Sequence, residues 1–193
     1  MVNDRYAVVD VETTGFSPAV DRIVEIACVL IDQDRVVGQW STLVNPGIPI
    51  PPRATQVHGI GDGAVVSAPG IELAEASLRR QCRSRLPVAH NASFDMSFLG
   101  WRSEGAICTL KLARALVPEA PDYKNQTLRR VLKIDRVLAD LGAHRALDDA
   151  LVTAHVLLAC RRRFGVRFPG RSWHAFLNEV AALRVMPPRG KAS

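Results

Sequence analysis

Three runs dominated by β-branched and other apolar residues open the chain. The first begins at about Tyr6, and the other two cover about residues 22–31 and 35–44. Residues of this kind favour extended strands, and Asp32-Gln33-Asp34 between the second and third runs is typical of a hairpin. The pattern therefore predicts three antiparallel strands at the start of the fold.

Further along, the spacing of apolar residues changes to that of amphipathic helices. The predicted helices cover about residues 69–85, 92–103, 109–117, 126–133, 145–163 and 172–184, and a short strand at 86–90 precedes the second of them. The proline-rich segment 45–52, which leads to residues 57–60, predicts a loop without regular structure. Strands first and interleaved helices later predict an α/β fold with a mixed central sheet flanked by helices.

The first strand carries two carboxylates, Asp10 and Glu12, shortly before Gly15. Because side chains alternate along a strand, positions i and i+2 point to the same face and the two carboxylates share one site. Like charges this close disfavour each other's ionisation, and a bound cation would hold both charged. Gly15 would let the backbone turn sharply or approach a ligand closely. Taken alone, the stretch also suits an ordinary strand that ends in a solvated acidic turn.

A further carboxylate lies on the helix predicted to begin near Arg145. Asp149 falls in line with Thr153, Val156 and Cys160, which form a stripe expected to be buried. A buried carboxylate needs a partner or a metal ion. Asp149 is therefore a candidate member of the same acidic site.

The neighbours of Asp149 give a different pattern. Asp148 shares a stripe with His155 and Arg162 that is expected to face solvent. His144 precedes Asp149 by five positions, about 140° on a helix, so the two side chains could not converge if both were helical. We therefore expect His144 on the loop before the helix, reaching the site from another side. Alone, it could equally be an ordinary surface histidine.

Asp95 lies five residues after His90, at a predicted junction between a strand and a helix. Ligands collect at such junctions, although a carboxylate in the first turn of a helix is also favoured by the helix dipole alone. In the same helix Phe94, Phe98 and Trp101 form an aromatic stripe, which is expected to be core rather than a surface on which bases stack.

Composition and charge narrow the class. With 193 residues, 48% hydrophobic and 23% charged, the chain is expected to form a globular domain over residues 1–165, followed by a packed helix and a short basic tail over 166–193. Residues 1–100 hold 8 Lys and Arg against 11 Asp and Glu, a net of −3, whereas residues 101–193 hold 17 against 8, a net of +9. The basic second half is the expected polyanion surface, so nucleic acid is a candidate partner.

Membrane and thiol chemistry are not expected. No apolar run approaches the roughly 20 residues that span a bilayer, and the first strand begins too early for a signal peptide, so a cytoplasmic protein without a membrane partner is predicted. The cysteines lie far apart with no CxxC spacing, which suits reduced core thiols better than a zinc site. They are Cys28, Cys82, Cys108 and Cys160.

Together these residues resemble the DEDDh class of 3′-to-5′ exonucleases, which includes the proofreading epsilon subunit of bacterial DNA polymerase III, RNase T and oligoribonuclease. The resemblance runs from about residue 6 to 159. Its motifs are Asp10-x-Glu12-Thr13-Thr14-Gly15, Val57-His58-Gly59-Ile60, His90-Asn91-Ala92-x-Phe94-Asp95 and His144-Arg145-Ala146-Leu147-x-Asp149-Ala150. A departure occurs at Cys108-Thr109-Leu110, where many relatives carry Asp-Thr-Leu, and this puts a local hydrogen bond in doubt rather than the chemistry.

The resemblance implies an RNase H-like exonuclease fold and a role for each site residue. Four carboxylates would hold two divalent cations, Mg²⁺ or Mn²⁺, and these are Asp10, Glu12, Asp95 and Asp149. Such ions stabilise the attacking and leaving oxygens of a phosphodiester displacement. His144 would take a proton from the attacking water, since histidine titrates near neutral pH. Residues implied in binding the terminal nucleotide are Thr13, Gly15, Phe16, Val57, His58, Asn91 and Phe94.

Three functions remain open at this level. The first is an exonuclease that hydrolyses single-stranded DNA 3′ ends to nucleoside monophosphates, in proofreading with a polymerase partner or in end trimming. The second is a ribonuclease of the same class that acts on RNA 3′ ends or short oligoribonucleotides. The third is a non-catalytic nucleic-acid-binding module, which would have no use for His144 beside four carboxylates. DNA is favoured over RNA, although the sequence does not reveal the pocket detail that reads a 2′-hydroxyl.

Overall fold

The computed structural model describes residues 4–134 and 144–183. In chain order its elements are β1 (Arg5–Thr13), β2 (Ile23–Asp32), β3 (Arg35–Leu43), α1 (Pro52–His58), α2 (Asp62–Val65), α3 (Ile71–Gln81), β4 (Leu86–Ala89), α4 (Ala92–Phe98), the 3₁₀ helix η1 (Ser103–Gly105), β5 (Ile107–Cys108), α5 (Thr109–Leu116), α6 (Asn125–Val131), α7 (Ala146–Arg167) and α8 (Trp173–Ala182).

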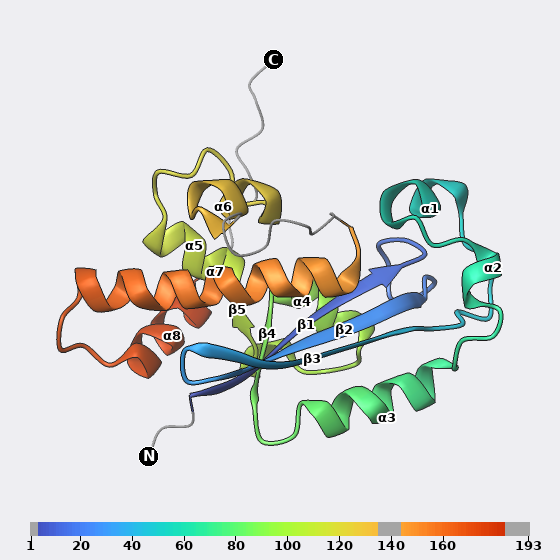
Figure 1. The fold of residues 1–193 in the computed structure, drawn as a ribbon, viewed down its shortest axis with the longest axis horizontal. Helices are drawn as coiled ribbons and strands as arrows, with labels where there is room; N and C mark the ends of the chain where they lie inside the picture. Colours follow the sequence, from blue (N-terminus) through green and yellow to red (C-terminus); the bar gives the residue numbers. More distant parts are fainter. Residues whose placement is uncertain (1–3, 135–143, 184–193) are drawn as a thin grey trace.

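The strands form one mixed sheet in the order β3-β2-β1-β4-β5 (Figure 1). β1 pairs antiparallel with β2, and β2 pairs antiparallel with β3. β4 is parallel to β1, and β5 is parallel to β4. The predicted α/β fold, with three antiparallel strands followed by parallel additions, is confirmed, and it places β1 at the centre of the sheet.

Helices cover both faces of this sheet, with α7 along one face and α3 along the other (Figure 1). Tyr6 and Val8 of β1 pack in one core together with residues of α5, α6, α7 and α8. Val9 and Val11, which alternate with them, pack in a second core with residues of α3 and α4. The alternation of side chains along β1 thus determines which of its residues can meet α7.

Some predicted boundaries are wrong. The segment predicted as a loop leads directly into α1, because Pro52 occupies the first turn of a helix, where a missing N–H group does no harm. α3 is shorter than predicted, covering Ile71–Gln81. α4 ends at Phe98 rather than near 103, and Gly100 follows it with a φ of +61°. Trp101 therefore lies outside the helix that was predicted to carry it.

The end of the described chain packs on the same body. Phe164 of α7 lies against Trp173 and Phe176 of α8, with ring centroids 5.3 and 4.7 Å apart. The division at residue 165 stays a prediction, and the basic tail beyond residue 183 lies outside the described residues. Among residues 4–134 and 144–183, no helix has the length and apolar character that a membrane crossing needs.

Candidate active site

The face of β1 that meets α7 changes from apolar to acidic along the strand. Tyr6 and Val8 are fully buried, and Asp10 and Glu12 continue the same face. On β2, Glu25 stands directly opposite Glu12 in the antiparallel register. One end of the sheet therefore presents several carboxylates to the helix above it.

The first turn of α7 brings Asp149 to these carboxylates. Carboxylate oxygens of Asp10, Glu12 and Asp149, one from each, all lie within 4.8 Å of one another. Thr153 and Val156, which share the stripe of Asp149, are fully buried, as the periodicity of the helix predicted. The buried side of α7 therefore faces the sheet and directs Asp149 toward β1.

Asp95 reaches the same region from α4. Its side chain is only 3% exposed, and its Oδ1 accepts a hydrogen bond of 3.3 Å from the backbone N–H of Val11. It lines the same cavity as Asp10 and Asp149, although it is not one of the three residues with mutually close oxygens. The four carboxylates thus converge from β1, α4 and α7.

Burial raises the pKa of every member of this group, and neighbouring carboxylates add to the effect. The pKa of Asp10 lies well above its usual value, because of burial first and then the charges of Asp95 and Asp149. Burial raises the pKa of Glu12 to about 8, with further contributions from Asp149 and Glu25. Burial likewise raises the pKa of Asp95 to about 8, against the opposing effect of backbone hydrogen bonds. Without a cation the site is electrostatically unfavourable in its charged form.

The donor set fits a hard divalent cation. Every close ligand atom is a carboxylate oxygen, the donor that Mg²⁺, Mn²⁺ and Ca²⁺ prefer, and no thiol belongs to the cluster. The buried like charges are the groups that such an ion would neutralise. Asp10, Glu12 and Asp149 therefore make a cluster suited to divalent metal.

The raised pKa values predict how the stability of the metal-free protein depends on pH. Between about pH 4, where unfolded carboxyl groups titrate, and about pH 8, where Glu12 and Asp95 titrate when folded, the native state holds protons that the unfolded state has lost. The free energy of unfolding should therefore fall as pH rises through this window. Melting curves in EDTA between about pH 5 and 8 measure the decline.

Millimolar Mg²⁺ or Mn²⁺ should raise the melting temperature most at the upper end of that window, since metal binds the deprotonated carboxylates. The double substitution of Asp10→Asn with Glu12→Gln is the matched control, and it should weaken both dependences, with the buried Asp95 accounting for the pH dependence that remains. Melting curves of the parent protein that respond neither to pH nor to metal would contradict a preformed acidic site.

His144 lies immediately before α7, in line with the prediction that it precedes the helix. Its backbone N–H donates a hydrogen bond of 2.9 Å to Oδ2 of Asp149, and the residue is exposed in the wall of the cavity. Its φ of +60° is uncommon for a residue other than glycine. His144 is therefore not on the face of α7 that carries Asp149, yet both residues line the same cavity.

The cavity at the carboxylates has a volume of about 990 Å³. Of the residues predicted to bind the terminal nucleotide, Asn91 and Phe94 line it. Phe16 is 84% exposed and lies beside Phe94, with ring centroids 6.5 Å apart. Phe94 is only partly buried, so the aromatic stripe predicted as core also contributes to the cavity wall.

The other predicted binding residues do not line this cavity in the described part of the chain. Val57 is exposed, whereas His58 is buried and its Nδ1 accepts a hydrogen bond of 3.0 Å from the N–H of Ile60. Thr13 is the last residue of β1, and Gly15 lies in the turn that follows the strand. A side chain at Gly15 would collide with the carboxyl group of Asp21, so the glycine makes room for that group.

Two further residues of the site were not predicted. Asn125, at the start of α6, contacts the carboxylate of Asp149 and donates a hydrogen bond of 3.1 Å to Oγ1 of Thr153. Burial lowers the pKa of His90 to about 4, and because a carbonyl oxygen can only accept, Nε2 of His90 donates the 2.7 Å hydrogen bond to the carbonyl of Tyr123 in the cavity wall. Both contacts join segments far apart in sequence, and no local pattern indicates them.

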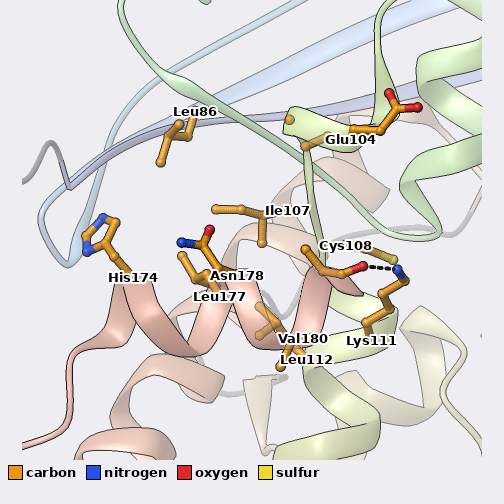
Figure 2. A pocket seen from close by; sticks show the side chains of 13 residues that line it. Leu86, Glu104, Ile107, Cys108, Lys111, Leu112, His174, Leu177, Asn178 and Val180 are labelled. Carbon is orange, nitrogen blue, oxygen red and sulfur yellow. Dashed lines mark hydrogen bonds between the residues drawn. The ribbon is translucent and has the colours of Figure 1, made fainter. Parts of the chain in front are cut away.

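A second, smaller cavity lies between β5 and α8, with a volume of about 140 Å³. Figure 2 shows the side chains of Leu86 and Ile107 facing His174 and Asn178 of α8, while Nζ of Lys111 donates to the carbonyl of Ala181. None of the four carboxylates lines it. Of these two cavities in the described part of the chain, only the larger one is lined by the four carboxylates.

Known proteins are similar to this chain in sequence and in fold. The profile of the RNase T exonuclease family matches residues 7–157. A DNA polymerase III of the PolC type from Caldanaerobacter subterraneus subsp. tengcongensis is 36% identical over 161 residues, which are 79% of this chain and 11% of the polymerase. A protein of Mycobacterium tuberculosis whose name describes a bifunctional exonuclease/endonuclease is 35% identical over 177 residues, 83% of this chain and 27% of that protein.

Among solved structures, exonuclease X in complex with 5′ overhanging duplex DNA is similar, with a TM-score of 0.71 and 32% identity over 91% of this chain and 99% of that one. The chain spans about a tenth and about a quarter of the length of the two curated relatives. Because the profile covers most of the chain and the relatives exceed 30% identity, the chain belongs to the RNase T-type family of DEDDh exonucleases.

Proposed function

We propose that this chain is a metal-dependent exonuclease that hydrolyses single-stranded DNA from the 3′ end and releases nucleoside monophosphates. The observation that carries the proposal is the convergence of Asp10, Glu12 and Asp149, with carboxylate oxygens within 4.8 Å of one another, in a cavity that Asp95 and His144 also line. A binding module without catalysis would gain nothing from such mutual repulsion.

In the proposed reaction, water attacks the phosphorus of the last phosphodiester and the bond to the preceding 3′ oxygen breaks. The shortened strand keeps that 3′ hydroxyl, and the released nucleotide carries the phosphate. Two Mg²⁺ or Mn²⁺ ions, when bound, would stabilise the charge on the attacking and leaving oxygens.

The residues of the chain have separate parts in this reaction. Asp10, Glu12, Asp95 and Asp149 would hold the two ions. His144 would accept the proton of the attacking water, since it lies in the cavity wall. Hard divalent cations held by carboxylates do not need an imidazole ligand. Phe16, Phe94 and Asn91 would contact the terminal nucleotide, and the large cavity leaves room for it.

DNA is the favoured substrate because the similar exonuclease X was solved with duplex DNA and the PolC-type relative is a DNA polymerase. The polymerase relative contains a segment like this chain within its much longer sequence, which favours proofreading with a polymerase partner over independent end trimming. A ribonuclease of the same family is the alternative.

Strands of the same sequence in DNA and in RNA, each labelled at the 5′ end, test this proposal. With Mg²⁺ we expect a ladder that shortens from the 3′ end of DNA faster than of RNA, and EDTA should abolish it. Faster shortening of RNA would establish the ribonuclease alternative. Binding without cleavage in Mg²⁺ and in Mn²⁺ would contradict both enzymatic functions.

A further inference from the structure

Glu25 is a buried acid next to the site, and the proposed reaction assigns it no role. It lies on β2 and is only 3% exposed. Both of its carboxylate oxygens accept hydrogen bonds at the start of α7, whose N-cap is Arg145. Oε1 accepts from Nη2 of Arg145 at 2.7 Å, and Oε2 accepts from Nε of Arg145 at 3.1 Å and from the N–H of Ala146 at 2.9 Å. The fork of the arginine makes this a bidentate ion pair across 120 positions of sequence.

The two residues that Glu25 binds lie between the two groups on which the chemistry depends. Arg145 follows His144 directly, and its carbonyl accepts the first helical hydrogen bond from the N–H of Asp149, at 3.0 Å. The carboxylate of Asp149 in turn accepts from the N–H of His144 at 2.9 Å. A shift of Arg145 would therefore move both the proposed base and a proposed metal ligand.

The position of Glu25 is electrostatically unfavourable apart from this pair. It stands opposite Glu12 in the sheet, and its charge raises the pKa of both Asp10 and Glu12. A buried carboxylate is tolerated when donors satisfy it. Within the described residues, the three hydrogen bonds to Glu25 come from Arg145 and Ala146, so the charge of Glu25 is satisfied when the start of α7 is in place.

We infer that Glu25 is a positioning residue for the hydrolysis: through Arg145 and the N–H of Ala146, it holds His144 and Asp149 against the carboxylates of β1. The inference rests on the proposed function. It assigns Glu25 no contact with substrate or metal, and it distinguishes a role in orientation from a contribution to stability alone.

The other end of β2 supplies a matched control. Asp32 pairs with Arg85, and in both pairs one partner is buried and the other is more exposed: side-chain exposure is 4% and 51% for Glu25 and Arg145, and 39% and 7% for Asp32 and Arg85. Glu25→Gln and Asp32→Asn each remove one charge with little change of shape. Melting curves show how far each variant is destabilised.

Steady-state hydrolysis of a single-stranded DNA, well below both melting temperatures, then separates orientation from stability. We expect Glu25→Gln to lower kcat by about 10- to 100-fold with KM within about threefold of the parent, since small misplacements of catalytic groups reduce rates by this order. Asp32→Asn should keep the parent kcat. Arg145→Lys, which keeps the charge without the fork, should lie between the parent and Glu25→Gln.

A double variant tests the route of the effect. If Glu25 acts through Arg145, Glu25→Gln combined with Arg145→Met should be no slower than the slower single variant, because each removes the same interaction. Additive losses would overturn the route. An unchanged kcat in Glu25→Gln, or an equal loss in Asp32→Asn, would overturn the positioning role while the parent stays active. A parent that cleaves nothing with any metal would overturn the proposed function as well.

Discussion

Replacing Asp149 with alanine is expected to lower the rate of DNA hydrolysis by at least about 10³-fold. A catalytic metal site supplies several kcal/mol of transition-state stabilisation, and about 1.4 kcal/mol corresponds to a factor of ten in rate. Asp10→Ala, Glu12→Ala and Asp95→Ala should have effects of the same order, because these four carboxylates converge on one cavity. Release of mononucleotides from a labelled single strand in Mg²⁺ measures the loss.

Folding should survive these substitutions. Each removes a carboxyl group whose pKa is raised by burial, so in EDTA at about pH 8 the variants should melt no lower than the parent. Asp148→Ala is the matched control, since Asp148 precedes Asp149 on the same helix but is not part of the close cluster. If Asp148→Ala lost activity while Asp149→Ala kept it, the wrong member of the pair would have been assigned to the metal site.

Replacing His144 with alanine should give a second large effect of a different kind. The rate should fall by about 10² to 10⁴-fold, the range typical of losing a general base. The affinities for Mn²⁺ and for a single-stranded 3′ end should stay close to those of the parent, because Asp149 is contacted by the backbone N–H of His144, which alanine retains. Calorimetry of Mn²⁺ binding beside single-turnover cleavage measures both properties.

His155→Ala supplies a control for the loss of an imidazole. His155 lies on the same helix as Asp149, does not line the cavity, and is partly buried. The His155→Ala substitution should leave the single-turnover rate unchanged. A His144→Ala variant that loses Mn²⁺ affinity in step with its rate would show a metal ligand instead of a base, and one that cleaves at the parent rate would show a bystander.

Local periodicity was sufficient to predict the part of the site that depends on single elements. The alternation of β1 placed Asp10 and Glu12 on one face, and the 3.6-residue period of α7 placed Asp149 on the same stripe as buried Thr153. Of the stripe predicted to face solvent, Arg162 is exposed, whereas Asp148 and His155 are partly buried.

Contacts between distant segments could not be predicted in this way. Nothing near Glu25 in sequence indicates that its partner is Arg145, and nothing near Asn125 indicates Asp149. α1 was missed because the prolines near its start were interpreted as incompatible with regular structure, although Pro52 is accepted in the first turn of the helix. With two residues, β5 is too short for any periodicity to indicate it.

The separation of the cluster along the chain has a consequence for its synthesis on the ribosome. Asp10 and Glu12 lie in the first strand, whereas Asp149 lies at the start of the long helix that covers the same face of the sheet. At translation rates of about 5–20 residues per second, roughly 7 to 28 seconds separate Asp10 from Asp149. A nascent chain therefore displays two of its clustered carboxylates long before it can complete the cluster, and the proposed activity requires synthesis to pass Asp149.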